Sequence, residues 1–427
     1  MPSDYIKAKN LFQELLAHDD LSRIRERLQP HTDTPAPHIP HMENCTVQGL
    51  DNRWALFPQA TAERDLLADP LTLSHMHSYQ RNIENFIGTV KVPVGLAGPL
   101  RVNGTHASGD YYIPLATSEA ALVASYSRGA NLISLAGGCT AVLLNEGVSR
   151  APAFAFTTLA SASEFALWTI NNVERLQQIV ESTTRHGKFS DLRITIEGNH
   201  VYLGIEILPG DASGQNMVTI AAEAACRFIL LNCPIKPAYF FVEGNLSGDK
   251  KASALSFLSV RGKKVSAEVV LPAPLLARVL KSTPAAIVDY WRMSAMGGVL
   301  SGTIGVQGHY ANGLAALYIA CGQDAACVSE SAVGVTRFEL TGNGDLYAAV
   351  TLPNLIVGSV GGGTGLPSQQ ACLRLMGLAG PGKARALAEV CAGVALAGEL
   401  SIIGALSAGD FTRAHQRLAR GDRHEPH

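Results

Sequence analysis

This 427-residue sequence lacks closely spaced cysteine pairs, a large net charge and a secretion signal. Its eight cysteines form no CxxC pair, and several lie in alanine-rich apolar segments. We therefore expect buried, reduced thiols and neither a disulfide framework nor a zinc or other metal site. The formal net charge of -2 gives no indication of a nucleic acid or a membrane surface as a partner. The N-terminal MPSDYIK lacks the basic start and apolar run of a signal peptide, so a soluble, cytoplasmic protein is expected.

Charged residues are also absent from residues 293–323, a segment long enough to cross a bilayer. The segment contains Gln307, His309 and Asn312, with five glycines before Asn312. This composition favours a buried helix-loop-helix at a site over a lipid-facing span.

The pattern along the chain predicts a mixed α/β (α+β) fold. The first 28 residues have the apolar periodicity of helices, and a linker rich in proline and histidine follows. Glycine and alanine then dominate, except between residues 152 and 242. In that interval we expect a helix over 163–178, two strands within 191–208, a helix over 214–231 and a strand over 238–242. After it, strands are expected over 256–260, 264–270 and 346–352.

This order of elements predicts a small ferredoxin-like domain inserted into a larger one. The expected parts are an N-terminal helical arm with its linker (1–80), a large domain (81–151 and 243–400), the small domain (152–242) and a mobile C-terminal segment (401–427).

Glu119 is the one acid in the apolar stretch between Ile113 and Tyr126. Thr117 or Ser118 is the expected N-cap of a helix, which would place Glu119 in its first turn. An acid there can simply complement the helix macrodipole. Few charges flank it, however, and partial burial would raise its pKa toward the range of a proton donor.

Two segments are suited to an anion. Residues 210–217, GDASGQNM, follow a predicted strand and open a helix, so their N–H groups can point at an anion, although such a segment is usually just a turn. Residues 183–188, TTRHGK, offer a hydroxyl, a guanidinium and an ammonium group for one phosphate, or else form a solvated basic loop.

Three further side chains could carry chemistry. Lys250, in the polar loop 243–251, can present a cation to a carbonyl oxygen that becomes an alkoxide, or can lie at the surface. Asp324 lies among small residues, so a partner such as Lys250 is expected; a structural ion pair is the alternative. His415 is suited to proton transfer near neutrality, or is an exposed surface residue.

Taken together, these segments resemble the hydroxymethylglutaryl-CoA reductase family. The match begins with ENFIG (84–88), PVGLAGP (93–99) and ATSE (116–119) and extends over residues 80–420. The resemblance implies reduction of hydroxymethylglutaryl-CoA to mevalonate and CoA by two hydride transfers from NADPH, through a thiohemiacetal and an aldehyde. It also implies a site between the subunits of a homodimer or homotetramer.

Four catalytic roles follow from the resemblance. Lys250 would stabilise the oxyanion, Glu119 would be the general acid of the aldehyde step, and Asp324 would hold both. His415 would protonate the CoA thiolate, although Ala414 replaces the serine that commonly precedes that histidine.

The resemblance also implies binding residues, with NADPH held by the small domain and no Rossmann fold. The expected cofactor-binding residues are Thr184, Arg185, His186, Asp211, Gly214, Gln215, Asn216, Met217, Gly361, Gly362 and Gly363. The expected substrate-binding residues are Glu84, Asn85, Arg128, Arg150, Asn245, Asp249, Arg292, His309 and Asn312. Met293 stands where the family has a lysine for the substrate carboxylate, and Arg292 is the candidate replacement.

Two other functions remain open at this point. The same fold could oxidise mevalonate with NAD, although the Thr184-Arg185 pair argues for the phosphorylated cofactor. Alternatively, the chain could be a catalytically silent CoA-binding protein, against which the joint presence of the four catalytic residues argues.

Overall fold

The computed structural model describes residues 4–18, 20–30, 36, 38–40 and 45–409. These residues form two compact units. The first contains the described residues up to Met76 together with Ile83–Gly88, and the second contains His77–Asn82 and the described residues from Thr89 onward. His415 and most of the predicted C-terminal segment lie outside the described residues.

The first unit is helical, as the sequence predicts for its N-terminal part. Its helices are α1 (Tyr5–His18), α2 (Leu21–Arg27), α3 (Val47–Trp54), α4 (Thr61–Leu67) and α5 (Pro70–Ser74). Two side chains at the end of α3 hold the returning segment. Arg53 NH1 donates to Phe86 O and Trp54 Nε1 donates to Ile87 O, each at 2.9 Å.

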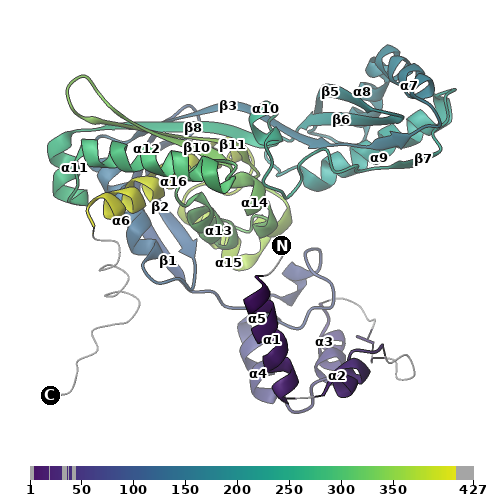
Figure 1. The fold of residues 1–427 in the computed structure, drawn as a ribbon, viewed down its shortest axis with the longest axis horizontal. Coiled ribbons are helices and arrows are strands. Elements are labelled where there is room, and N and C mark those ends of the chain that lie inside the picture. Colours follow the sequence, from purple (N-terminus) through teal and green to yellow (C-terminus); the bar gives the residue numbers. More distant parts are fainter. Residues whose placement is uncertain (1–3, 19, 31–35, 37, 41–44, 410–427) are drawn as a thin grey trace. The chain divides into compact units, whose positions relative to one another are not determined.

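A mixed sheet runs through the second unit (Figure 1). Its order is β7-β4-β6-β3-β8-β11-β10-β9, with β1 paired to β2 and β3, and β5 paired to β6. The strands are β1 (Val94–Gly104), β2 (Ser108–Ala116), β3 (Cys139–Arg150), β4 (Ala153–Ala155), β5 (Lys188–Glu197), β6 (His200–Leu208), β7 (Tyr239–Phe241), β8 (Gly262–Leu271), β9 (Gly305–Val306), β10 (Gly334–Leu340) and β11 (Leu346–Leu355).

The helices of the second unit pack on this sheet or on one another. They are α6 (Leu122–Leu135), α7 (Leu159–Asn171), α8 (Val173–Ser182), α9 (Gln215–Asn232), α10 (Leu255–Leu258), α11 (Ala273–Leu280), α12 (Pro284–Ser301), α13 (Tyr310–Ala320), α14 (Val328–Ser331), α15 (Pro367–Leu375) and α16 (Ala384–Ser407). Short 3-10 helices occur at η1 (Met76–Tyr79), η2 (Ala325–Cys327) and η3 (Gly362–Gly365). The mixed α/β fold class is confirmed.

Strand β3 belongs to both halves of the sheet. From Thr140 to Gly147 it pairs with β8, and from Val148 to Arg150 it pairs with β6. The buried side chains accordingly form two clusters: Cys139 and Ala141 belong to the larger one, and Val148 belongs to the smaller one, built mainly from β6, α7, α8 and α9. One strand therefore carries the chain from the first core into the second.

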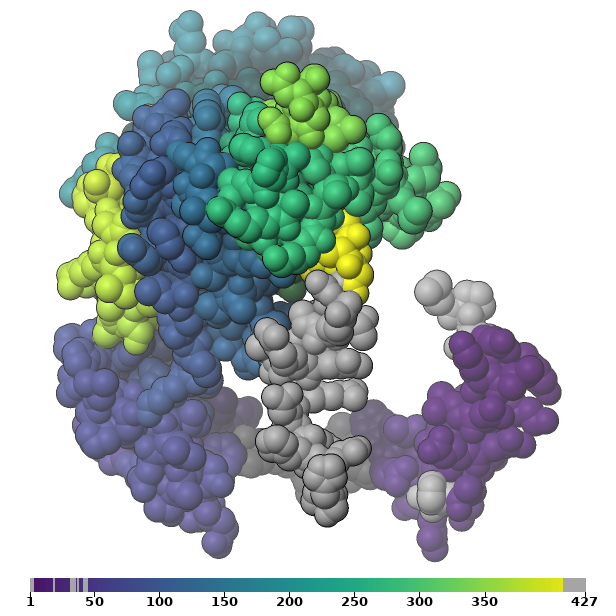
Figure 2. All heavy atoms as spheres, turned by 90° about the vertical axis from the view of Figure 1, so that its left-hand side faces the viewer, coloured from purple at the N-terminus to yellow at the C-terminus, as the bar shows by residue number. Residues whose placement is uncertain are grey.

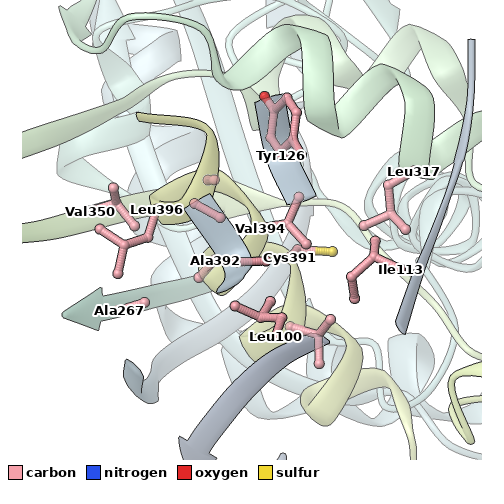
Figure 3. Close-up of a cluster of buried hydrophobic side chains, with 14 of the residues drawn as sticks. Leu100, Ile113, Tyr126, Ala267, Leu317, Val350, Cys391, Ala392, Val394 and Leu396 are labelled. Atoms are coloured by element: carbon pink, nitrogen blue, oxygen red, sulfur yellow. The ribbon is translucent and has the colours of Figure 1, made fainter. Parts of the chain in front are cut away.

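Helix α16 is the centre of the larger core. It packs against α6, α12 and α13 and against β1, β3, β8 and β11. Figure 3 shows its side chains surrounded by those of the strands and of α6 and α13; the labelled residues are Leu100, Ile113, Tyr126, Ala267, Leu317, Val350, Cys391, Ala392, Val394 and Leu396. In Figure 2 the last described residues form only a small yellow patch, where α16 reaches the surface.

By length and composition α16 could cross a membrane. Within the described part of the chain it is the one helix that passes this test, and 83% of its most apolar window is buried in the chain's own core. Such burial is typical of a core helix, which reaches this apolarity because it is surrounded on all sides.

Three local predictions need correction. The helix expected over 163–178 is two helices, because Asn172 Nδ2 donates to the Trp168 carbonyl at 2.8 Å and ends α7. The strand expected over 256–260 is wrong: residues 255–258 form the short helix α10. The helix-loop-helix over 293–323 exists, but only its second helix is buried, since Met293 and Leu300 of α12 are 77% and 82% exposed.

The predicted burial of the cysteines is confirmed. All eight are unpaired and buried. The described residues contain no group of three or more His, Cys, Asp or Glu side chains placed to hold a metal ion.

A glycine on α6 sets the distance between α6 and α16. A Cβ atom on Gly129 would lie 1.9 Å from the Ala397 carbonyl oxygen. Helix propensity alone favours alanine by about 1 kcal/mol, whereas overpacking costs about 1–3 kcal/mol. We therefore expect Gly129→Ala to lower the thermal unfolding midpoint by several degrees, measured by circular dichroism.

The matched control is Gly297→Ala, also within a helix, where a Cβ atom would meet no atom within 4 Å. This variant should unfold at or slightly above the wild-type temperature. Equal midpoints for the two variants would contradict the packing argument.

Candidate functional site

The structure places the two charges expected to pair in direct contact. Lys250 Nζ lies 2.8 Å from Asp324 Oδ2, and the two side chains are 44% and 43% exposed. The other oxygen, Asp324 Oδ1, accepts the N–H of Ala326 at 3.0 Å at the start of η2. The expectation that Lys250 is the partner of Asp324 is confirmed.

The pair holds both groups in their charged forms. The hydrogen bond to Asp324 raises the pKa of Lys250 above its usual value. Burial alone would raise the pKa of Asp324, but the hydrogen bonds from Lys250 and the Ala326 N–H outweigh it, so that pKa lies below its ordinary value. The site therefore presents a half-exposed ammonium group that stays protonated at neutral pH.

The predicted substrate residues of the Lys250 loop are fixed by backbone and ionic contacts. Asp249 Oδ2 lies 2.7 Å from Arg150 NH1, and Arg150 Nε donates to Thr219 Oγ1 at 2.8 Å. Asn245, with a positive φ of 65°, donates its N–H to Glu243 Oε1 at 2.6 Å.

Glu119 does not lie in a helix. Helix α6 begins at Leu122, and Ala121 before it has a positive φ of 71°, so the predicted position in the first turn is wrong. Thr117 Oγ1 instead accepts the N–H of Glu119 at 3.0 Å in the loop after β2. The Glu119 side chain is exposed in the single chain and, among the described residues, forms no ion pair.

A cavity of about 500 Å³ adjoins the ion pair, and Asp324 is one of its lining residues. It is lined by residues 212–217 at the start of α9, residues 322–324 and the glycine-rich segment 358–364. Of the predicted cofactor residues, those at the cavity are Gly214, Gln215, Asn216, Met217, Gly361, Gly362 and Gly363. No side chain caps the N terminus of α9, so its N–H groups remain suited to an anion.

Close backbone contacts give the cavity its shape. A Cβ atom on Gly322 would lie 2.2 Å from the Gly363 carbonyl oxygen, so no larger residue fits there. The Gln323 side chain holds Gly358 from both sides: its Nε2 donates to Gly358 O at 3.0 Å and its Oε1 accepts Gly358 N–H at 2.8 Å.

The predicted phosphate loop lies next to α9. Thr184 Oγ1 accepts the N–H groups of His186 and Gly187 at 3.2 and 3.0 Å, and it lies 3.2 Å from the sulfur of Met217, which lines the cavity. The Thr184 hydroxyl thus shapes the turn, while Arg185 and His186 are exposed.

Asp211, predicted to bind the cofactor, has its carboxylate engaged within the chain. Its Oδ2 accepts the N–H of Gly382 at 2.7 Å and its Oδ1 accepts that of Ala384 at 3.3 Å. These N–H groups belong to the start of α16, so Asp211 joins the cavity-lining segment to the central helix.

His309, which is predicted to bind the substrate, is held in place through its backbone. Its N–H donates to Glu399 Oε1 at 2.7 Å, and its carbonyl accepts the Tyr126 hydroxyl at 3.0 Å. The His309 ring stacks on Tyr126 with centroids 5.5 Å apart. Its Nε2 is buried and has no hydrogen-bond partner within the described chain. Asn312, one turn further on, is half-buried.

The remaining predicted substrate residues are dispersed in the single chain. Arg128 donates to the hydroxyl and carbonyl of Ser401, each at 2.8 Å. Arg292 is exposed and pairs with Asp289 at 3.2 Å on the surface of α12. Glu84 and Asn85 belong to the first unit.

Sequence reasoning missed several organising side chains, chiefly Glu399, Tyr126, Gln323, Arg261 and Glu330. Glu399 could have been found by the argument used for Asp324, because it is one of few charges in a long apolar run. Gln323 directly precedes Asp324 in the sequence, but nothing in the sequence indicated that Gly358 would lie next to it.

Comparisons with known proteins give a family match and similar sequences for this chain. Residues 50–420 match the family model described as hydroxymethylglutaryl-coenzyme A reductase. The chain is 43% identical over 359 residues to the 3-hydroxy-3-methylglutaryl-coenzyme A reductase of Methanothermobacter thermautotrophicus, a match that covers 82% of this chain and 90% of that protein. It is 45% identical over 356 residues to the protein of that name from Aeropyrum pernix, covering 82% and 84%.

A solved structure shares the fold. It is that of the class II 3-hydroxy-3-methylglutaryl-CoA reductase from Streptococcus pneumoniae bound to NADPH, with 20% identity and a TM-score of 0.63. The match covers 83% of this chain and 86% of the solved one.

The buried imidazole of His309 should be neutral at physiological pH. Burial lowers its pKa from 6.5 to about 4. We expect its NMR signal, assigned by comparison with His309→Asn, to show no titration between pH 5 and 8. Because the folded-state pKa is depressed, His309 should reduce stability only as the pH falls from 6.5 toward 4. A midpoint near 6.5 would show that the ring is solvated.

Proposed function

Because the chain belongs to the hydroxymethylglutaryl-coenzyme A reductase family, we propose that it reduces hydroxymethylglutaryl-CoA to mevalonate and CoA with NADPH. The observation that carries the proposal is the contact between Lys250 and Asp324 at the edge of the glycine-lined cavity. A cation fixed beside a nucleotide-sized cavity is what reduction of a carbonyl group by a bound cofactor requires.

Lys250 would act on the substrate oxygen in both reductions. When the thioester and later the aldehyde accept hydride, negative charge develops on the carbonyl oxygen, and a preorganised ammonium group lowers the barrier. Asp324 keeps Lys250 protonated and directs its Nζ, since the two atoms are 2.8 Å apart. Glu119 would protonate the alkoxide of the second step, and His415 would protonate the departing CoA thiolate; both roles remain predictions.

NADPH fits the residues that line the cavity. Backbone groups approach closely at Gly322 and Gly363, and the uncapped N terminus of α9 is suited to the pyrophosphate. Arg185 is exposed and forms no ion pair with another described residue, so its guanidinium group can bind the 2′-phosphate of NADPH. When bound, NADPH supplies the hydride.

A second copy of the chain would complete the site. Lys250 and Asp324 meet within one chain, whereas Glu119 is exposed on the loop before α6 and contacts neither of them. Exposed apolar side chains on α12, among them Met293, Met296, Val299 and Leu300, provide surface for a subunit contact. We infer a homodimer or a homotetramer built from such dimers, in which Glu119 of one subunit joins Lys250 of the other.

Several finer points belong to the same proposal. Arg292 would hold the substrate carboxylate only if it leaves Asp289, with which it pairs in the single chain. A cytoplasmic location suits an enzyme with eight reduced thiols and an NADPH substrate.

The first test is oxidation of NADPH by the purified protein in the presence of hydroxymethylglutaryl-CoA. We expect mevalonate as product and a higher kcat/KM with NADPH than with NADH. Lys250→Ala should lower kcat by roughly 10²–10³-fold, because one positioned charge at the developing oxyanion is lost. The matched control is Lys236→Ala, an exposed lysine of the small domain that donates to the Leu230 carbonyl.

The outcomes separate the alternatives. Faster turnover of mevalonate with NAD than of the CoA ester with NADPH would favour the oxidative enzyme. CoA-ester binding without turnover in either direction would indicate a silent binding protein.

The shared site can be tested by mixing inactive variants. When Glu119→Gln and Lys250→Ala chains are coexpressed, half of the random dimers are mixed and one of their two sites is intact. About a quarter of the wild-type activity should return. Coexpression of Lys250→Ala with Asp324→Asn should restore none, because these residues meet within one chain. Rescue in neither mixture would place Glu119 and Lys250 in the same subunit's site.

A further inference from the structure

Arg261, the residue before β8, joins three segments of the site while being only 2% exposed. Its NH1 donates to Glu330 Oε1 at 2.6 Å, and its NH2 donates to Asp249 Oδ1 at 2.6 Å. The same NH2 donates to Gln215 Oε1. We refer to Gln215, Asp249, Arg261 and Glu330 as the arginine cluster.

On one side, the arginine cluster holds the Lys250 loop. Glu330, on α14, is fully buried, and its Oε1 also accepts the backbone N–H of Lys250 at 3.1 Å. Asp249 lies between Arg261 and Arg150, with one carboxylate oxygen on each guanidinium group. The loop is thus fastened through the side chain of Asp249 and the backbone of Lys250.

The backbone of Lys250 needs this support. Its φ of 54° lies in the left-handed region, which is unfavourable for a residue with a side chain and persists only where the surroundings determine it. The Glu330 carboxylate fixes the N–H of this residue. Without the cluster, Lys250 would relax and its Nζ would lose its position against Asp324.

On the other side, the arginine cluster reaches the cavity. Gln215 is the first residue of α9 and lines the cavity. Its Oε1 is held by Arg261, while its Nε2 is buried and has no hydrogen-bond partner among the residues that the structure describes. A buried amide donor without an acceptor is costly, so a shift of the Gln215 side chain that brings Nε2 to an acceptor on a ligand in the cavity would be favoured.

Stability alone is a weak reason for such a cluster. Removing two charges from water is costly, and apolar replacements of a buried ion pair are often as stable. The contacts of Arg261 instead connect the cavity directly with the Lys250 loop. Arg261 binds Gln215 on the cavity side and Asp249 and Glu330 on the loop side.

We propose that Arg261 is a positioning residue that couples occupancy of the cavity to the alignment of Lys250, with Gln215 as its contact on the cavity side. A nucleotide acceptor that engages the Gln215 amide fixes its orientation, and Arg261 carries that constraint to Asp249 and Glu330. The identity of the nucleotide rests on the proposed function. By linkage, a well-aligned Lys250 loop in turn strengthens nucleotide binding.

Hydrogen exchange tests the coupling without requiring turnover. With saturating NADPH, exchange of residues 247–251 in the wild-type chain should slow by at least about fivefold, the lower end of typical couplings. Gln215→Met, which keeps the size of the side chain but cannot bond to Arg261, should bind NADPH more weakly and lose this protection at saturation.

The matched control is Arg193→Lys, which alters another arginine–glutamate pair, that with Glu206; within the described chain neither residue is hydrogen-bonded to a member of the arginine cluster. It should retain the protection. Protection that survives in Gln215→Met, or its absence from the wild-type chain, overturns the inference.

Kinetics provide a second readout. The groups that face the Lys250 ammonium are Asp324, Cys327 and Asp249; each raises the pKa of Lys250, and the hydrogen bond to Asp324 has the largest effect. Arg261→Lys keeps the charge but cannot make all the contacts, so kcat should fall roughly 10- to 100-fold with a smaller change in KM for the CoA ester. The alkaline limb of the kcat profile should move to lower pH, because Lys250 loses Asp324.

If the alkaline limb of the kcat profile is unchanged in Arg261→Lys, Arg261 has a purely structural role. The control Arg193→Lys should change neither kcat nor the alkaline limb. Absence of turnover in the wild-type protein would sink the proposed function, while the exchange experiment would still decide the coupling.

Discussion

Two buried carboxylates on α16 determine where the loops of the larger core lie. A buried carboxyl group must be hydrogen-bonded, and each of these accepts most of its hydrogen bonds from backbone N–H groups. Glu389 accepts the N–H groups of His106, Ala107 and Leu143, which fixes the β1–β2 turn against β3. Glu399 accepts those of Gly308 and His309 and the hydroxyl of Thr336, which fixes the entry to α13. The long apolar helix at the centre of the larger core is thus also the one that orders its polar segments.

The same principle links the small and large parts of the second unit. Asp211, from the segment before α9, accepts N–H groups at the start of α16, and Lys263 of β8 lies within hydrogen-bond distance of the carbonyls of Gly210 and Val357. Burial lowers the pKa of this lysine. The cavity-lining loops are therefore fastened to the core by the half-buried carboxylate of Asp211 and the buried amino group of Lys263, which keeps the cavity close to the Lys250–Asp324 pair.

The sequence predicted the mixed fold, most of the small part and the Lys250–Asp324 contact, because these depend on local periodicity or on the cost of an unpaired acid. It failed where tertiary contacts decide. Residues 255–258 have strand-like composition, yet Ser256 accepts a bond from Asn354, a residue distant in sequence, and the segment is helical. Glu119 was placed in a helix because neither the positive φ of Ala121 nor the later start of α6 could be read from the residue types. Arg261 was missed because its importance lies in three partners on three separate segments.

The burial of the cysteines bears on what the site releases. Burial raises the pKa of Cys139, Cys226 and Cys391 to about 12, so at pH 7 only about one molecule in 10⁵ carries a given thiolate. Burial also raises the pKa of Cys327, which lies beside Lys250 and Asp324. Mixed disulfides form by attack of a thiolate. The reductase liberates a free thiol at each turnover. Within the described chain it has no reactive thiolate that could form a mixed disulfide with the oxidised form of that product.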